Sequence, residues 1–143
     1  MILKQISVFV ENRSGRLSEI TEVLAGSQVD IRALSIADTT NFGILRLIVN
    51  RPETAYQALK AAGCTVSITE VIAIVVEDRP GTLSAALTAL ASQGVGVEYM
   101  YAFTSRESGT ANVILRVDNS EKALSVLAGK GIKTLTSQDI CEE

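Results

Sequence analysis

Val10–Ser18 reads VENRSGRLS, and 66 residues later Val76–Ser84 reads VEDRPGTLS. The two stretches agree at six of nine places. The same spacing extends beyond them, with a shift to 68 near Gly63 and Gly131; the further matched pairs are Leu24/Leu90, Val29/Val95, Gly43/Gly109 and Ile48/Ile114. The chain therefore consists of two copies of one unit. We place the first domain at residues 1–69 and the second at residues 70–143.

Length and composition narrow the class of protein. Two units of about 70 residues are near the lower limit for independent cores, so each copy is expected to depend on the other. Hydrophobic residues make up 47% of the 143 residues and charged residues 20%. No apolar run is long enough to span a bilayer, and the first ten residues do not form a signal segment. We expect a cytoplasmic protein that does not enter a membrane.

Several functions are disfavoured by what the sequence lacks. The net charge is −3, so no long-range field attracts nucleic acid. Cys64 and Cys141 are far apart and histidine is absent, which argues against a metal site. Ser14 and Ser18 have no histidine to activate them. We expect no cofactor, no metal and no catalytic residue.

The first half of each copy predicts a strand, a turn and a helix. Alternating residues over Lys4–Val10 indicate a half-buried strand, and the more uniformly apolar Val71–Val76 indicates a strand nearer the middle of a sheet. Each strand leads through a glycine-containing turn into an amphipathic helix. The expected buried stripes are Leu17, Ile20, Val23 and Leu24, and Leu83, Leu87, Leu90 and Ala91.

The second half of each copy predicts two further strands, a helix and a last short strand. The expected strands are Ile31–Ala37, Ile44–Val49 and Thr65–Ile68, and Val97–Phe103, Thr110–Val117 and Ile132–Leu135. Gly43 and Gly109 are expected to form hairpin turns, with loops at Asp38–Phe42 and Thr104–Ser108. The helices begin after Pro52–Glu53 and after Asp118–Ser120, with stripes Ala55, Leu59 and Ala62, and Ala123, Leu124 and Leu127.

The predicted order in each copy is β-α-β-β-α-β. This order is that of the ferredoxin-like group, so we expect an α+β fold of two tandem units, each an antiparallel sheet with two helices on one face. Thr65–Ile72 runs from one copy into the next without a linker. We expect the units to lie side by side, an arrangement that protects exposed strand edges. Duplication for stability alone is the alternative explanation.

The repeated turn carries the chemistry. Its helix start leaves backbone N–H groups free to meet a small anion. Asn12 and Asp78 supply oxygens that either cap the helix or accept from an ammonium group. Gly15 and Gly81 are costly within a helix, so a ligand near the backbone or tight packing must explain them. The plainer alternative is a capped helix start with Pro80 in its first turn.

The strand, the DRPGTL turn at Asp78–Leu83, the helix and Val95–Val97 together resemble the ACT domain, an amino-acid-sensing module. The resemblance covers the whole chain as two tandem copies, and the βαββαβ order is that family's fold. The first copy departs from the family pattern, because Asn12 replaces Asp and Ser14 replaces Pro.

The resemblance implies that such domains pair and bind an amino acid at their interface, between this turn and the opening of a neighbour's second strand. The implied ligand-binding residues are Asn12, Arg13, Ser14, Gly15, Leu17, Asp30, Ile31 and Arg32 in the first copy, and Asp78, Arg79, Pro80, Gly81, Leu83, Gly96, Val97 and Glu98 in the second. We expect a non-enzymatic amino-acid sensor that acts by ligand-dependent association as a homodimer. A regulatory subunit of a separate biosynthetic enzyme is the alternative, and an enzyme is the least favoured.

Three other segments carry weaker signals. Gly94–Tyr99 begins like a dinucleotide-binding loop but lacks its third glycine and enters a strand. Tyr99 and Tyr101 share a strand face and line either a pocket or interface, or an ordinary packed sheet. Lys130–Lys133 is expected to be a solvated turn from helix to strand.

Overall fold

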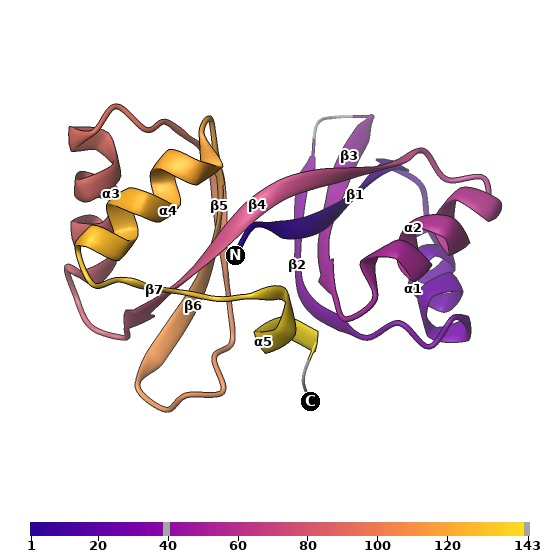
Figure 1. The fold of residues 1–143 in the computed structure, drawn as a ribbon. Coiled ribbons are helices and arrows are strands. Elements are labelled where there is room, and N and C mark those ends of the chain that lie inside the picture. The colour runs from indigo at the N-terminus through magenta and orange to yellow at the C-terminus, as the bar shows by residue number, and fades with distance from the viewer. Residues whose placement is uncertain (39–40, 142–143) are drawn as a thin grey trace. The chain divides into compact units, whose positions relative to one another are not determined.

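The computed structural model describes residues 1–38 and 41–141 of the chain (Figure 1). The elements follow in the order β1 (Leu3–Glu11), α1 (Arg16–Gly26), β2 (Ile31–Asp38), β3 (Phe42–Val49), α2 (Pro52–Ala61), β4 (Val66–Glu77), α3 (Thr82–Ser92), β5 (Val97–Phe103), β6 (Thr110–Val117), α4 (Ser120–Gly129), β7 (Lys133–Thr134) and α5 (Ser137–Cys141). No helix of the described part is long and apolar enough to cross a membrane.

The chain forms two compact units. The first unit contains Lys4–Thr69 together with Ile140 and Cys141, and the second contains Met1–Leu3 and Glu70–Asp139. Each unit therefore includes a few residues that lie far in sequence from its main segment. The division along the main part of the chain falls between Thr69 and Glu70, inside β4.

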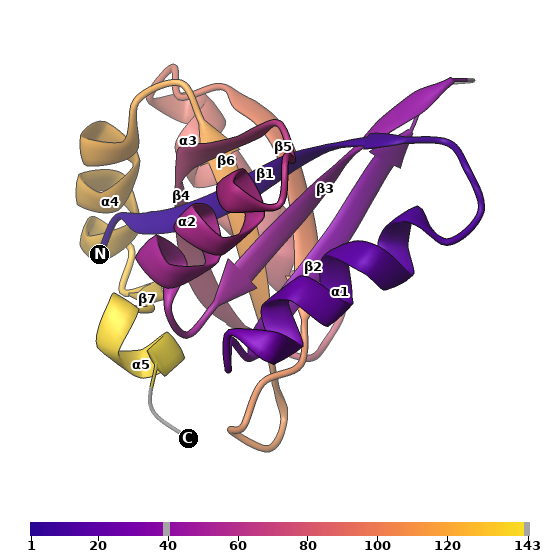
Figure 2. The ribbon, with the colours of Figure 1, turned by 90° about the vertical axis from the view of Figure 1, so that its right-hand side faces the viewer.

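The first unit is a four-stranded antiparallel sheet. Its strand order is β2-β3-β1-β4, with Ile6 paired to Leu47 and Phe9 paired to Ile44. The last strand joins through Phe9, whose N–H donates to Thr65 O at 2.9 Å. Both α1 and α2 lie on one face of this sheet (Figure 2). The result is the predicted βαββαβ unit.

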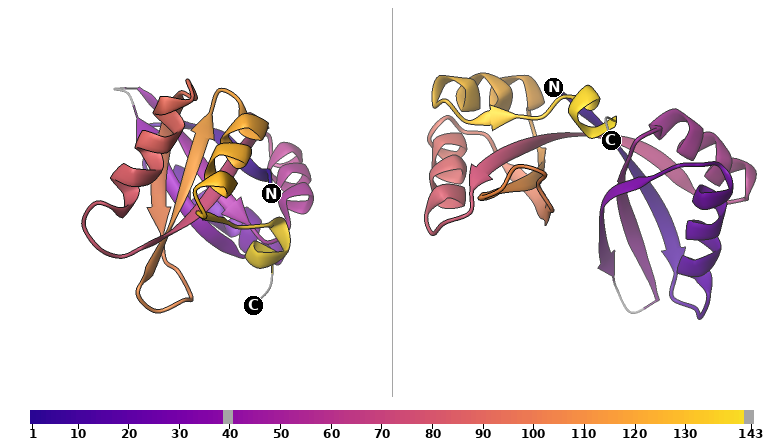
Figure 3. Two further views of the ribbon diagram at one scale, coloured as in Figure 1. Left: turned by 60° about the vertical axis from the view of Figure 1, so that its left-hand side comes forward. Right: turned by 90° about the horizontal axis from the view of Figure 1, so that it is seen from below.

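The second unit repeats this design with β7-β4-β6-β5 as its strand order. β4 pairs with β6 through Ile74 and Val113, and with β7 through Ile74 and Thr134. Both α3 and α4 cover one face (Figure 3). The α+β ferredoxin-like class expected from the sequence is therefore confirmed in both copies.

β4 joins two strands that the sequence predicted separately. It runs without a break over 12 residues, so the expectation of a chain without a linker is confirmed. Val71, Ile72, Ala73 and Ile74 are all fully buried. Burial of four consecutive residues means that both faces of this strand are covered, as its uniformly apolar sequence indicated.

Each unit has its own apolar core between helices and sheet. α1 contributes Ile20 and Leu24 to the first core, and α3 contributes Ala86 and Leu90 to the second. The strand residues of these cores are Ile6, Val8, Val10, Leu45, Leu47 and Val49, and Ile72, Ile74, Val113, Leu115 and Val117. These positions carry the predicted alternation.

Three predicted stripe residues are exposed. Leu17 is 43% exposed, whereas its counterpart Leu83 packs against the second core. Ala91 is exposed because one residue beyond Leu90 lies 100° further round the helix. Ala62 is exposed because α2 ends at Ala61.

One of the two predicted hairpin glycines was assigned wrongly. Gly43 lies within β3, paired to Val10 and Asp38, and a Cβ there would stand 3.2 Å from Ala37 O. Gly43 therefore permits a close approach of strands rather than a turn. Gly109, with φ +79°, does precede β6 in a turn. The predicted loop at Asp38–Phe42 includes residues 39–40, which lie outside the described residues.

The contrast between two leucines of α1 gives a test of the core. We expect Leu24→Ala to lower the free energy of unfolding by about 2–5 kcal/mol, because Leu24 is 1% exposed. Leu17→Ala is the matched control and should cost less than about 1 kcal/mol, because Leu17 is 43% exposed and lies outside the first core. Urea denaturation measures both. Equal losses would contradict the core described above.

Candidate functional site

The repeated turn has the same backbone in both units. Gly81 is the N-cap of α3 with φ +91°, and Gly15 is the N-cap of α1 with φ +82°. The first α-helical hydrogen bond of α3 runs from Ala85 N to Gly81 O at 3.0 Å. The N–H groups of Leu83 and Ser84 therefore have no acceptor within the helix. These groups form the bare helix start that the sequence suggested.

The left-handed backbone explains the two glycines. A Cβ at Gly15 or Gly81 would meet no atom within 4 Å, so neither close packing nor a nearby group is needed to account for them. Both are N-caps rather than residues of the first helical turn, and neither helix start has a side-chain cap hydrogen bond. Asn12 and Asp78 are thus not helix caps, and Pro80 precedes the cap.

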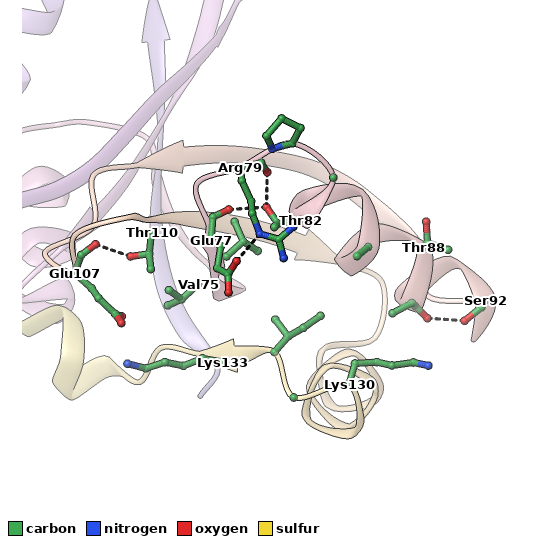
Figure 4. Close-up of a pocket in the computed structure, with 17 residues that line it drawn as sticks. Val75, Glu77, Arg79, Thr82, Thr88, Ser92, Glu107, Thr110, Lys130 and Lys133 are labelled. Atoms are coloured by element: carbon green, nitrogen blue, oxygen red, sulfur yellow. Dashed lines mark hydrogen bonds and ion pairs between the residues drawn. The ribbon is translucent and has the colours of Figure 1, made fainter.

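An open groove of about 960 Å³ lies beside this turn in the second unit (Figure 4). Its walls are the end of β4, the outer side of α3 and the segment from α4 into β7. Its lining residues are Val75, Val76, Glu77, Arg79, Pro80, Gly81, Thr82, Ala85, Thr88, Ala89, Ser92, Glu107, Thr110, Lys130, Gly131, Ile132 and Lys133.

The groove exists because the ladder between β4 and β7 is short. β7 pairs only with Ile74 and Val75 of β4. Beyond this pair the chain bends away at Gly131, which has φ +70°. The edge of β4 at Glu77 is consequently uncovered. Glu77 O accepts instead from Thr82 Oγ1 at 2.6 Å and from Arg79 N at 2.9 Å.

Charged side chains stand on opposite sides of the groove. Arg79 Nε donates to the carboxylate of Glu77 on one side, and Lys130 and Lys133 stand across from them (Figure 4). Neither lysine, nor the carboxylate of Glu107, forms an ion pair within residues 1–38 and 41–141. The groove can therefore offer positive charge to an anion and a carboxylate to a cation.

The turn of the first unit carries an ion-pair network instead. Arg13 Nη2 lies 2.9 Å from Glu19 Oε2, and Arg16 Nη1 lies 3.1 Å from the same oxygen. Arg16 Nε is 3.0 Å from Glu11 Oε2, in an ion pair without hydrogen-bond geometry. Hydrogen bonds from Arg13 and Arg16 lower the pKa of Glu19, and the bond to Glu19 raises the pKa of both arginines.

A smaller pocket of about 220 Å³ lies on the other side of this first turn, toward β2 and β3. Its lining residues are Val10, Glu11, Asn12, Arg13, Arg16, Leu17, Ile36, Asp38, Phe42 and Gly43. The two copies of the turn thus have hollows of different size in different places.

The openings of the second strands are tied to their own units. Asp30 N donates to Asn50 Oδ1 at 2.8 Å, and Asn50 N donates back to Asp30 O at 3.1 Å. Gly96 and Asp118 form the same reciprocal pair, with both bonds at 3.1 Å. Backbone groups predicted to face a ligand there already have partners.

The structure gathers only part of the predicted site. The groove brings together Arg79, Pro80 and Gly81, and the small pocket brings together Asn12, Arg13 and Leu17. The predicted residues that line neither hollow are Ser14, Gly15, Asp30, Ile31, Arg32, Asp78, Leu83, Gly96, Val97 and Glu98.

The sequence did not indicate that Thr82 lines the groove, nor that the segment Lys130–Lys133 forms part of its wall. Aligning the copies would have found them, because Thr82 replaces Arg16 at a spacing of 66, and Lys130 and Lys133 replace Ala62 and Thr65 at a spacing of 68.

Comparison with known proteins agrees with this fold. A family model described as an ACT domain pair matches residues 1–142, which confirms the resemblance seen in the sequence. The crystal structure of protein BT0572 from Bacteroides thetaiotaomicron is 43% identical, with a TM-score of 0.94 and coverage of 100% of this chain and 98% of that chain. No curated protein matches.

A more distant structure shares the fold alone. The ligand-free regulatory subunit of aspartate kinase from Thermus thermophilus is 16% identical, with a TM-score of 0.65 and coverage of 88% of this chain and 91% of that chain.

The two N-cap glycines can be tested against a glycine of ordinary conformation. Gly15→Ala and Gly81→Ala should each lower the free energy of unfolding by about 1–2 kcal/mol, because a Cβ is disfavoured at positive φ. Gly26→Ala at the other end of α1 should be neutral or stabilise by up to about 1 kcal/mol. All three sites are open around the added Cβ, so thermal or urea unfolding isolates the backbone term. A loss at Gly26 equal to that at Gly15 would refute this account.

The ion-pair network predicts a pH dependence of stability. The pKa of Glu19 is lowered from its ordinary 4.5, so its contribution is present above that value and is lost as the pH falls through the lowered pKa. We expect Glu19→Gln to remove part of the acid loss of stability below about pH 4.5. Glu22→Gln on the same helix, outside the network, is the control. Unfolding measured between about pH 3 and pH 7 should separate them, and superimposable profiles would contradict the role of the network.

Proposed function

Because the chain belongs to the ACT domain pair family, we propose that it is a non-enzymatic sensor that binds a free amino acid in the groove of the second unit and regulates by ligand-dependent association. The observation that carries the proposal is the uncapped start of α3 at the wall of an open groove with charges on opposite sides. An α-amino acid is a small zwitterion and matches both features.

The carboxylate of the ligand is assigned to the α3 side of the groove. N–H groups without acceptors stand at the start of α3, and a charge near a helix N-terminus contributes about 0.3–1 kcal/mol. Lys130 and Lys133 add positive charge that no side chain of the described part neutralises by an ion pair. The ammonium group is assigned to a carboxylate of the lining, either Glu77 or Glu107.

The openness of the groove supports association as the response. Binding sites for small molecules bury most of the ligand within roughly 300–1,000 Å³. The groove has a suitable volume but is open to solvent, so a bound amino acid needs a further wall. A second copy of the chain would supply that wall in a homodimer. Ligand binding then favours the dimer, because the ligand has higher affinity for the closed state than for the open one.

A second function is favoured by the fold of the aspartate kinase regulatory subunit. That protein is a regulatory subunit of an amino-acid-metabolising enzyme, and its fold extends over most of this chain. In this alternative, the chain docks on a separate biosynthetic enzyme and confers feedback inhibition. It predicts a stable complex with such an enzyme in size-exclusion chromatography, and inhibition of that enzyme only when the ligand is present.

Calorimetric titration with each of the twenty amino acids tests the leading proposal. We expect one amino acid, or a few related ones, to bind, and Lys133→Gln to weaken binding by about tenfold through loss of a charge-assisted contact. Lys122→Gln on α4, a lysine outside the groove, is the matched control and should bind as the unaltered chain does. No binding by any amino acid, or equal weakening by both variants, would overturn the proposal.

A further inference from the structure

We propose that only the second unit binds the ligand, because the side chain of Arg16 occupies in the first unit the space that is open as a groove in the second. The inference rests on the proposed function for the chemistry of the ligand. The inference adds the number of binding sites per chain and names the residue that closes the site of the first unit.

Equivalent positions define the two grooves. Arg16 corresponds to Thr82 at a spacing of 66, and Cys64 corresponds to Ile132 at a spacing of 68. In the second unit Thr82 and Ile132 are on opposite walls of the groove. In the first unit Arg16 Nη2 lies 3.7 Å from Cys64 Sγ. The arginine therefore bridges the two walls that stand apart in the second unit.

Arg16 is held in this position from α1 and β1. Its guanidinium is paired with Glu11 and Glu19, and only 13% of its side chain is exposed. Arg13 binds the same carboxylate of Glu19 and so fixes it. A ligand entering this space must displace a charged side chain with three polar contacts, which disfavours occupancy.

The second unit has no counterpart of this plug. Thr82 is short, and its hydroxyl donates back to Glu77 O at 2.6 Å, away from Ile132. Ala85 stands in the place of Glu19, so a carboxylate that could hold a cation across the groove is absent at this position. The lining residues Thr82 and Ala85 thus leave the hollow free.

The charged residues beside the turn also differ between the two units, and this difference again favours binding in the second. Lys130 and Lys133 border the second groove, whereas the first copy has Ala62 and Thr65 at these positions. The first unit thus keeps the turn but lacks the two lysines that attract an anion, and its pocket of about 220 Å³ lies toward β2 and β3 rather than in the place of the groove. We infer one ligand site per chain.

Amide chemical shifts of the ¹⁵N-labelled full chain test the location of binding. The probe is an equimolar mixture of the twenty amino acids. We expect shifts at Gly81, Thr82 and Leu83, with none at Gly15, Arg16 and Leu17. Shifts at the first turn, alone or together with the second, would overturn this inference but leave amino-acid binding intact. A spectrum without any shift would overturn the proposed function and this inference together.

Exchanging residues between the copies tests the plug. Thr82→Arg combined with Ala85→Glu should close the second groove and weaken binding of the same mixture by at least about tenfold, as expected for a site filled by an ion-paired side chain. Ala91→Glu, on the same helix but outside the groove, adds a charge without a plug and serves as control. Equal weakening by the control would show that added charge, rather than the plug, acts.

The accessibility of the native Cys64 thiol tests, without any ligand, whether Arg16 blocks the space beside it. In a Cys141→Ser background, Arg16→Thr with Glu19→Ala should raise the rate of Cys64 alkylation by iodoacetamide at least about tenfold near pH 10, where an ordinary thiol is ionised and the rate reports access. Glu22→Ala is the matched control and should leave the rate unchanged. An unchanged rate in the double variant, with its fold retained by circular dichroism, would overturn the assignment of Arg16 as the plug.

Discussion

A left-handed glycine at the start of a helix is the constraint on which the site depends. Gly15 and Gly81 close the turns that lead from β1 into α1 and from β4 into α3, and the first N–H groups of each helix follow them. No side chain caps either helix start. An L-residue would resist this backbone, and a capping side chain would occupy the N–H groups. The turn therefore keeps its donors available at a modest cost in stability.

The surroundings of this turn differ between the two copies because a few neighbouring residues diverged. Arg16 and Glu19 fill the space beside the first turn with ion pairs. Thr82 and Ala85 leave the corresponding space empty, and the short pairing of β7 with β4 widens it. A duplicated unit can thus assign binding to one copy and leave the other free to serve the stability of the pair.

Much of the fold could be predicted from the sequence, because the repeat doubles every pattern. The alternation of apolar and polar residues in Lys4–Val10 and the apolar stripe of α4 are visible in short segments of sequence. Burial in the structure follows both patterns. Leu17 and Gly43 could not be placed in this way. Whether the first leucine of a helix reaches the core, or whether a glycine lies in a turn or a strand, depends on packing between elements distant in sequence. The groove was hidden for the same reason, since its lysines come from a segment about 50 residues after the turn.

One site per chain changes how occupancy can control association. With two equivalent sites per chain, a homodimer would add the contributions of four ligands; with the one proposed site it adds two, each equal to the ligand's difference in affinity between open and closed states. That difference limits the shift in the dimer equilibrium, and a shift from mostly open to mostly closed requires roughly 5.5 kcal/mol. A groove open to solvent can supply such a difference only if closure buries the ligand. In the proposed dimer, the wall that would cover the groove is therefore as important for selectivity as the residues that line it.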